Sequence, residues 1–298
     1  MRQKSKIIML SIAAIIVALI VWGMIEPYLI EVEEETASIE NLPPEWEGKE
    51  LIAIGDFQVG MWLDNDSNLE DIVDEVISRS PEAVLLLGDY VYRSVDDRQE
   101  EMEKVLSYLK PLTESGIPVY AVLGNHDYNM MKKKSDPNMK IAEKTKEDLE
   151  GIDVKVLHNA STPLRIKETD QPLYLVGIGA HWPEEDNVNE AFNKVGKEAA
   201  KFVFMHNPNT FSDIPARQAP SSVAGHTHGG QFRVPFTPHW SWKDLFAKGE
   251  AHADGWVTDD FGADGNQLYV NRGIGVSLVP LRLNNFPEIT EFHLKQAR

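Results

Sequence analysis

Short apolar runs alternate with segments of helical periodicity in the first half of the chain. The runs cover residues 51–54, 83–87 and 118–123, and each ends in a polar cluster that begins with glycine. Between them, residues 69–77 and 102–109 repeat apolar side chains with the spacing of one helical face. Alternating strands and helices of this kind predict an α/β core with buried strands.

The same pattern predicts where individual elements begin and end. Ser67 and Glu70 have the spacing of a capping box at the start of the first helix, and Pro111 is expected to end the second. Further apolar runs predict strands over residues 173–177, 202–205, 222–224, 267–271 and 289–294.

The N-terminal segment predicts a membrane anchor. Residues 7–25 carry no charge, and a helix of that length spans roughly 28 Å, close to the thickness of a bilayer core. Basic residues precede it (Arg2, Lys4, Lys6) and the first acidic residue is Glu26, which places the N-terminus in the cytoplasm and the rest of the chain outside the cell membrane. A cleaved signal peptide is the alternative, although no small-x-small site follows the apolar stretch directly.

Three regions follow from these patterns. Residues 1–25 form the anchor, which acts as an uncleaved signal-anchor. Residues 26–49 are acidic, contain Pro43-Pro44 and form a connector or edge strand, and residues 50–298 form one globular domain.

Composition narrows the chemistry. The net charge of -18 disfavours nonspecific binding to nucleic-acid backbones, and no nucleic-acid partner is expected. The chain has no cysteine, which excludes disulfides, zinc–thiolate sites and thiol catalysis. Any metal must bind oxygen and imidazole ligands.

Polar side chains that suit divalent metals follow five of the apolar runs, where open α/β sheets gather ligands. Carboxylate, amide and imidazole groups can hold two such ions about 3.5–4 Å apart, with one carboxylate shared between them. The clusters supply Asp56, Asp89, Asn125, His126, His206, His226 and His228.

The last cluster, Gly225-His226-Thr227-His228-Gly229-Gly230-Gln231, has a further property. On an extended strand its two histidines would point to opposite faces, but the glycines on both sides allow the backbone to bend and bring both rings into one cleft. A glycine-rich turn with two solvated histidines is the alternative for this motif taken alone.

Together, these motifs resemble those of the calcineurin-like metallophosphoesterase superfamily, and in particular its bacterial membrane-anchored branch with the GHTHGGQ sequence. The resemblance covers roughly residues 26–298. It implies a four-layer sandwich in which two mixed β-sheets are flanked by helices, with a dinuclear metal centre at the strand ends.

The resemblance also implies a role for each residue. Asp89 would bridge two metals and His126 would assist the leaving group while Asp127 fixes its tautomer. A metal-bridging hydroxide would attack phosphorus. The other ligands would be Asp56 and His228 for the first metal, and Asn125, His206 and His226 for the second.

One position departs from the family pattern. Gln58 stands where the family usually has histidine, so the first metal site is expected to bind more weakly or to favour Mn or Mg. Three alternatives remain: the Gln58 carbonyl ligates, a water ligates and Gln58 binds that water, or the site is too weak for turnover. Mn is the expected metal, with Mg, Fe or Zn as alternatives.

The sequence thus predicts a membrane-anchored phosphoesterase that hydrolyses phosphoester or pyrophosphate bonds of lipid-linked or cell-envelope substrates. The alternatives are a general nucleotide phosphatase or phosphodiesterase, and a degenerate metal-binding module that docks phospholipid or cell-wall polymer. The aromatic stretch from Phe232 to Phe246, with Trp240 and Trp242, is either core or an amphipathic edge. The remaining histidines are assigned no role: His158, His181, His239, His252 and His293.

Overall fold

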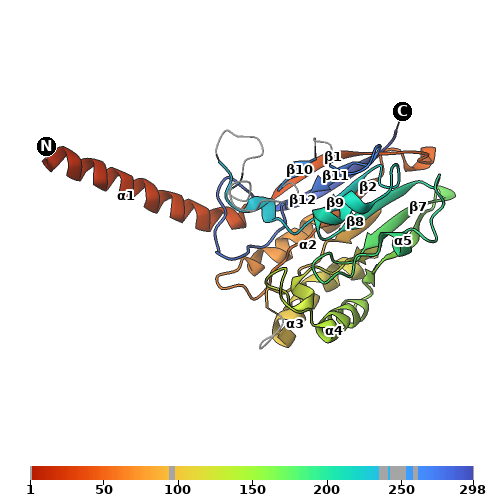
Figure 1. Cartoon of the computed structure of the whole chain (residues 1–298), viewed down its shortest axis with the longest axis horizontal. Helices are drawn as coiled ribbons and strands as arrows, with labels where there is room; N and C mark the ends of the chain where they lie inside the picture. Colours follow the sequence, from red (N-terminus) through yellow and green to blue (C-terminus); the bar gives the residue numbers. More distant parts are fainter. Residues whose placement is uncertain (1, 94–97, 235–240, 242–252, 258–260, 298) are drawn as a thin grey trace.

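Two mixed β-sheets form the centre of the protein (Figure 1). The computed structural model describes residues 2–93, 98–234, 241, 253–257 and 261–297. In that part of the chain, the first sheet has the strand order β1-β12-β2-β3-β4-β5 and the second has the order β10-β11-β9-β8-β7-β6.

The first sheet consists of β1 (Glu31–Ile39), β2 (Glu50–Ile54), β3 (Ala83–Leu86), β4 (Val119–Ala121), β5 (Lys155–Val156) and β12 (Glu288–Gln296). The second consists of β6 (Ala160–Ile166), β7 (Thr169–Ile178), β8 (Lys201–Met205), β9 (Ser222–Ala224), β10 (Gly255–Trp256) and β11 (Leu268–Val270). The strands from β2 to β5 are parallel, as are those from β7 to β9 with β11.

The two sheets pack face to face, and helices cover their outer faces. Leu85 on the first sheet and Phe204 on the second belong to the same buried core. The outer face of the first sheet is covered by α2 (Leu69–Arg79), α3 (Arg98–Glu114) and α4 (Met139–Glu150). The second is covered by the short α5 (Val188–Ala191) and the 3-10 segment η5 (Pro208–Asp213). The predicted sandwich of two mixed sheets flanked by helices is confirmed.

Strand β12 connects the edge of the first sheet to its centre. It pairs in parallel with β1 and antiparallel with β2. Its Phe292 side chain lies in the core between the sheets, with ring centroids 5.1 Å from Phe202 and 5.5 Å from Tyr269. This aromatic cluster ties the two sheets together.

Two of the predicted helix ends are wrong. Ser67 lies in a 3-10 turn (η3, Asp66–Asn68) and α2 begins after it, because Asn68 donates its side-chain amide to the Pro27 carbonyl instead of capping the helix. Pro111 lies inside α3. The helix continues to Glu114 because Leu112 is fully buried and Ser115 N–H donates to the Pro111 carbonyl.

Helix α1 (Arg2–Ile25) projects away from the sandwich and is long and apolar enough to cross a membrane (Figure 1). Its inner end is part of the domain, because Gly23, Glu26 and Pro27 are buried. Trp240 and Trp242, predicted to lie in core or at an amphipathic edge, fall outside the described residues, as do His239 and His252.

The cluster around Phe292 generates a stability prediction. Replacing Phe292 with Ala leaves a cavity between the sheets and should lower the free energy of unfolding by about 3–5 kcal/mol. Lys295→Ala, on an exposed position of the same strand, is the matched control and should change it by less than about 0.5 kcal/mol. Urea unfolding of the full chain in detergent micelles measures both. Equal effects would contradict the assignment of Phe292 to the inter-sheet core.

Candidate metal centre

The carboxyl ends of strands from both sheets meet at one edge of the sandwich. Asp56 follows β2, Asp89 follows β3 and Asn125 follows β4 on the first sheet, while His206 follows β8 and His226 follows β9 on the second. Backbone hydrogen bonds hold these loops together, since Asp56 N–H donates to Gly88 O at 2.9 Å and Gly225 N–H donates to His206 O at 3.0 Å.

His206 is at the centre of this arrangement. Its Nδ1 lies 2.8 Å from the carbonyl oxygen of Leu87, which can only accept, so Nδ1 carries the proton of the neutral ring. Its Nε2 then faces the rest of the site, as a lone pair in the neutral ring and as a donor to Asp89 in the protonated ring. Three further atoms approach it: Asn125 Oδ1 at 3.1 Å, His226 Nδ1 at 3.1 Å and Asp89 Oδ2 at 3.3 Å. Such a concentration of electron-pair donors suits a cation.

The amide of Asn125 is oriented by a separate contact. Its Nδ2 donates to the carbonyl oxygen of Met130 at 2.9 Å, so its Oδ1 must face His206. Asn125 therefore presents an oxygen to the centre, as a metal ligand would.

Two buried oxygens of the loop after β2 lack partners. Among the described residues, Asp56 Oδ2 and Gln58 Oε1 are buried without a hydrogen bond. An orphaned buried carboxylate oxygen is costly unless a proton or a cation satisfies it. The donor set thus fits divalent cations on an observation independent of the motifs.

Gln58 is oriented differently from a simple ligand. Its Nε2 donates to Asp89 Oδ2 at 3.0 Å and lies 3.4 Å from His228 Nε2. An amide nitrogen cannot bind a metal, whereas rotation of the amide by 180° would direct Oε1 to the same place. The structure brings Gln58, Asp89 and His228 together, but with the amide nitrogen facing the presumed ligands.

His228 is held by the C-terminal segment of the chain. Its Nδ1 lies 3.4 Å from Gly275 O, and its backbone carbonyl accepts from Asn285 Nδ2 at 2.7 Å. The His226 ring is in contact with the edge of Trp182, at a centroid distance of 4.8 Å. These supporting residues were not predicted, because contacts between distant loops leave no periodic signal in the sequence.

The backbone of the centre is strained. Asp56, Gln58, Asp89, His226 and His228 all have positive φ angles, between 51° and 73°. Side chains other than glycine adopt this conformation at a cost of roughly 1–3 kcal/mol each, and such residues cluster at functional sites.

Gly124 shows how tightly the loops are packed against each other. A Cβ atom at this position would lie 2.2 Å from Asp89 Oδ1 and 2.6 Å from His206 Cε1. Only glycine leaves room for both side chains, which explains why glycine precedes Asn125.

Burial and mutual charge set the ionisation of the centre. Burial lowers the pKa of His206, but the charges of Asp89 and Asp56 outweigh it and raise that pKa to about 9. Burial and the Asp89 charge raise the pKa of Asp56 to about 7, against the opposing charge of His206. For Asp89, the charges of His206 and His126 outweigh burial, and its pKa falls below its usual range. Asp89 is therefore the carboxylate best able to share positive charge.

His126 and Asp127 do not form the pair that the sequence predicts. His126 Nδ1 lies 2.6 Å from the carbonyl oxygen of Tyr92, whose ring stacks on the imidazole at 5.4 Å. This carbonyl, instead of Asp127, fixes the tautomer and leaves Nε2 directed toward Asp89, 4.0 Å from its Oδ2.

The Asp127 carboxylate organises the surrounding backbone. It accepts N–H groups from Gly124 at 2.7 Å, Asp89 at 3.0 Å and Tyr90 at 3.1 Å. It thereby connects the loop after β3 to the loop after β4. The sequence predicts that Asp127 acts on His126, whereas in the structure its carboxylate holds these two loops together.

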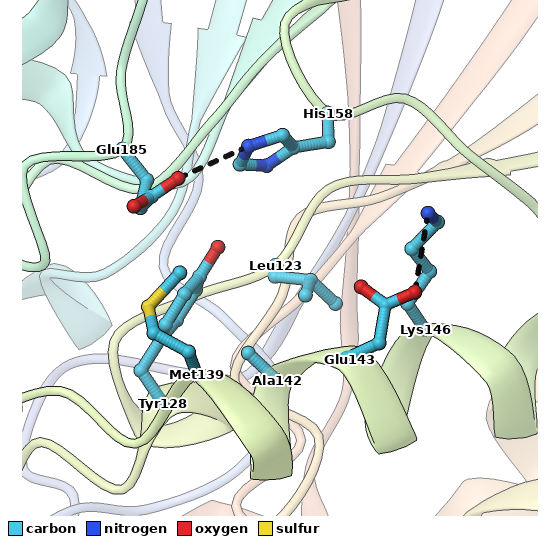
Figure 2. A pocket seen from close by; sticks show the side chains of 8 residues that line it. All are labelled: Leu123, Tyr128, Met139, Ala142, Glu143, Lys146, His158 and Glu185. Carbon is cyan, nitrogen blue, oxygen red and sulfur yellow. Dashed lines mark ion pairs between the residues drawn. The ribbon is translucent and has the colours of Figure 1, made fainter.

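A cavity of about 80 Å³ lies beside η4 (His126–Tyr128), but it contains none of the predicted ligands (Figure 2). The Tyr128 side chain points into it, and His158 forms an ion pair with Glu185 at 3.3 Å across its opening. A second group of potential ligands, Glu50, Glu291 and His293, lies on the first sheet, where Arg79 already pairs with Glu291. Neither place competes with the centre around Asp89.

Comparison with known proteins agrees with this geometry. Residues 50–231 match the sequence profile of the calcineurin-like phosphoesterases. Phosphodiesterase YaeI of Escherichia coli is 31% identical over 228 residues, which cover 76% of each chain. UDP-2,3-diacylglucosamine pyrophosphatase LpxG of Chlamydia muridarum is 23% identical over 307 residues, which cover 89% of this chain and 91% of that protein.

The profile begins with β2 and ends at Gln231, so it spans every residue predicted here as a metal ligand. The family predicted from the sequence motifs is thereby confirmed: the chain belongs to the calcineurin-like phosphoesterase family.

Proposed function

We propose that the protein is a metal-dependent hydrolase of phosphoesters or pyrophosphates, with its centre around Asp89. The observation that carries this proposal is the meeting of His206 Nε2, His226 Nδ1 and Asp89 Oδ2, whose ligand atoms all lie within 4.8 Å of one another. Family membership supports a divalent metal and a phosphoester substrate.

We assign the donor atoms to two groups that share Asp89. Asn125, His206 and His226 would hold one cation with Asp89, while Asp56 and His228 would hold another, with Gln58 completing the second group if its oxygen turns inward. When bound, such cations neutralise charge on the phosphoryl oxygens and acidify a water for attack on phosphorus. Two ions, with Mn as the expected metal and Mg, Fe or Zn as alternatives, remain part of the proposal.

His126 has the position of a general acid. The Tyr92 carbonyl keeps a proton on Nδ1, so Nε2 is a lone pair in the neutral ring and carries the second proton in the protonated ring, where it faces the centre. When the P–O bond to the leaving group breaks, Nε2 donates this proton to the departing oxygen. The stacked Tyr92 ring prevents the imidazole from turning away.

The substrate is proposed to be lipid-linked. The inner end of α1 contacts the loops that carry the centre, since Asn285 binds both Glu26 and the His228 carbonyl. LpxG, by its name, acts on a diacylated nucleotide sugar pyrophosphate, and this supports the same class of substrate.

The basic residues at the start of α1 support a cytoplasmic N-terminus, which would put the proposed catalytic domain on the outer side of the cell membrane. The anchor would raise the local concentration of membrane-bound substrates around the cleft. General nucleotide phosphatase or phosphodiesterase activity is the alternative within the same chemistry.

A second function is favoured by one observation. The Gln58 amide nitrogen faces Asp89 and His228, where a cation would lie. A protein that kept this arrangement would bind one metal at most and could dock phospholipid or cell-wall polymer without cleaving it.

Removing the general acid tests the catalytic proposal. His126→Ala should lower kcat on bis-p-nitrophenyl phosphate by about 10²–10⁴-fold while leaving bound metal in place. Asp89→Asn should lose both metal and turnover. His293→Ala, a histidine on the first sheet paired with Glu50, is the matched control and should keep full activity. Bound metal without turnover on this diester or on p-nitrophenyl phosphate in the unaltered chain would favour the docking module.

Position 58 generates a separate prediction. Gln58→His replaces a neutral amide with an imidazole beside Asp89 and His228 and should raise the affinity of the weaker metal site by about tenfold or more. Calorimetric titration of the metal-stripped full chain with Mn²⁺ measures this change. Identical titrations for the two proteins would mean that Gln58 is not a ligand.

A further inference from the structure

Two loops expose large apolar side chains at the inner end of α1. Trp62, Leu63 and Leu278 are 59%, 64% and 61% exposed. Outside positions 7–29, the other exposed large apolar residues of the described chain are Met139 and Val234, at 47% and 38%, so the most exposed ones lie in these two loops.

The backbone at both leucines is unusual. Leu63 has a φ angle of 52° and Leu278 one of 64°, a left-handed conformation that glycine or asparagine adopts more easily. In water, neither the left-handed backbone nor the exposed leucine side chain would stabilise the folded chain. A bulky apolar residue held outward at such a cost indicates a surface that does not face water.

The first loop is attached to the end of the helix. Tyr28 Oη donates to Asp64 O at 3.3 Å, and Asn65 Nδ2 donates to Pro27 O at 2.9 Å. Trp62 and Leu63 therefore lie directly beside the residues where α1 enters the domain.

The second loop is attached to the last turn of α1. Arg282 N–H donates to Gly23 O at 3.0 Å, and a Cβ atom on Gly23 would lie 3.7 Å from Leu281. Figure 1 shows both loops, orange and dark blue, around the inner end of α1. The exposed leucines thus lie in two loops that are both bound at the inner end of one apolar helix.

The helix identifies what these loops face. Its side chains from Ile7 onward are largely exposed, and by length and composition it can cross a membrane. A surface continuous with the end of such a helix lies at the bilayer interface, where tryptophan is enriched and leucine can enter the acyl region.

We propose that Trp62, Leu63 and Leu278 form a seating surface, by which the domain rests on the lipid bilayer that α1 enters. The occupant of this surface is lipid, and no protein partner is required. This orientation of the domain on the bilayer does not depend on whether the metal centre is catalytic.

Seating would fix the height of the metal centre above the membrane. Ser277 N–H donates to Gln231 Oε1 at 3.0 Å, and Gln231 Nε2 donates to Val279 O at 3.0 Å, so the second loop is bound to the segment that carries His226 and His228. On the first loop, Met61 turns inward and packs with Tyr92 and Val276. The seating surface and the centre are therefore parts of one rigid set of loops.

The chain has no cysteine, so single cysteines can report depth. Spin labels at Trp62→Cys, Leu63→Cys and Leu278→Cys are compared in the full chain, reconstituted in phosphatidylcholine vesicles. Lys194→Cys, exposed just after α5, is the control. We expect the first three labels to be more accessible to oxygen than to a water-soluble nickel complex, and the control to show the reverse. Four labels that all favour the nickel complex would overturn the proposal and indicate a protein partner or free solvent.

A second variant tests whether the leucines bind the bilayer or only lie near it because α1 is close. Leu63→Gly with Leu278→Gly suits the left-handed backbone, so the loops should fold, but it removes the apolar side chains. In this background the label at position 62 should shift toward the nickel complex. A label that stays as deep as before would show that α1 alone sets the depth and that the leucines do not seat the domain.

Discussion

One electrostatic constraint organises the site, because several buried polar atoms meet at Asp89 and need a proton or a cation between them. His206 donates its Nδ1–H to the Leu87 carbonyl, so its Nε2 faces Asn125, His226 and Asp89 and binds either a proton or a metal ion. Much of the surrounding structure serves to hold this arrangement. Asp127 joins the loops by accepting three backbone N–H groups, and Gly124 leaves the space that the side chains need. Burying these polar atoms without a proton or cation between them would destabilise the folded chain. A divalent cation bound to them would stabilise it.

The same loops connect the centre to the apolar helix α1. Glu26, at the end of α1, is fully buried and binds the backbone of Asn285, whose side chain binds the His228 carbonyl. The segment that directly follows the helix is therefore part of the support of a predicted metal ligand, His228. This arrangement supports the proposed lipid-linked substrate, because the loops that carry the centre also contact the helix that is proposed to enter the bilayer.

Much of the fold and of the ligand set could be predicted from the sequence, because both leave local signals. Buried parallel strands appear as short apolar runs, and the polar clusters after them locate Asp56, Asp89 and Asn125 at one edge. Contacts between loops far apart in the chain have no such signal. The carbonyl group beside His126 belongs to the Tyr92 backbone and leaves no trace in any motif. For that reason the sequence motifs assign the tautomer of His126 to Asp127. The extension of α3 beyond Pro111 depends on the burial of Leu112, a tertiary effect that outweighs the local preference of proline.

The central claim, that the residues around Asp89 hold divalent metal, is tested most directly by anomalous diffraction from crystals of the full chain grown with Mn²⁺. The account predicts one strong peak among Asp89, Asn125, His206 and His226, and a second, weaker peak toward Asp56 and His228, about 3.5–4 Å away. A single peak would mean that the centre is mononuclear and that the Gln58 amide occupies the position of the second ion. No peak at saturating Mn²⁺ would contradict the account, because the buried lone pairs would then be satisfied by protons alone.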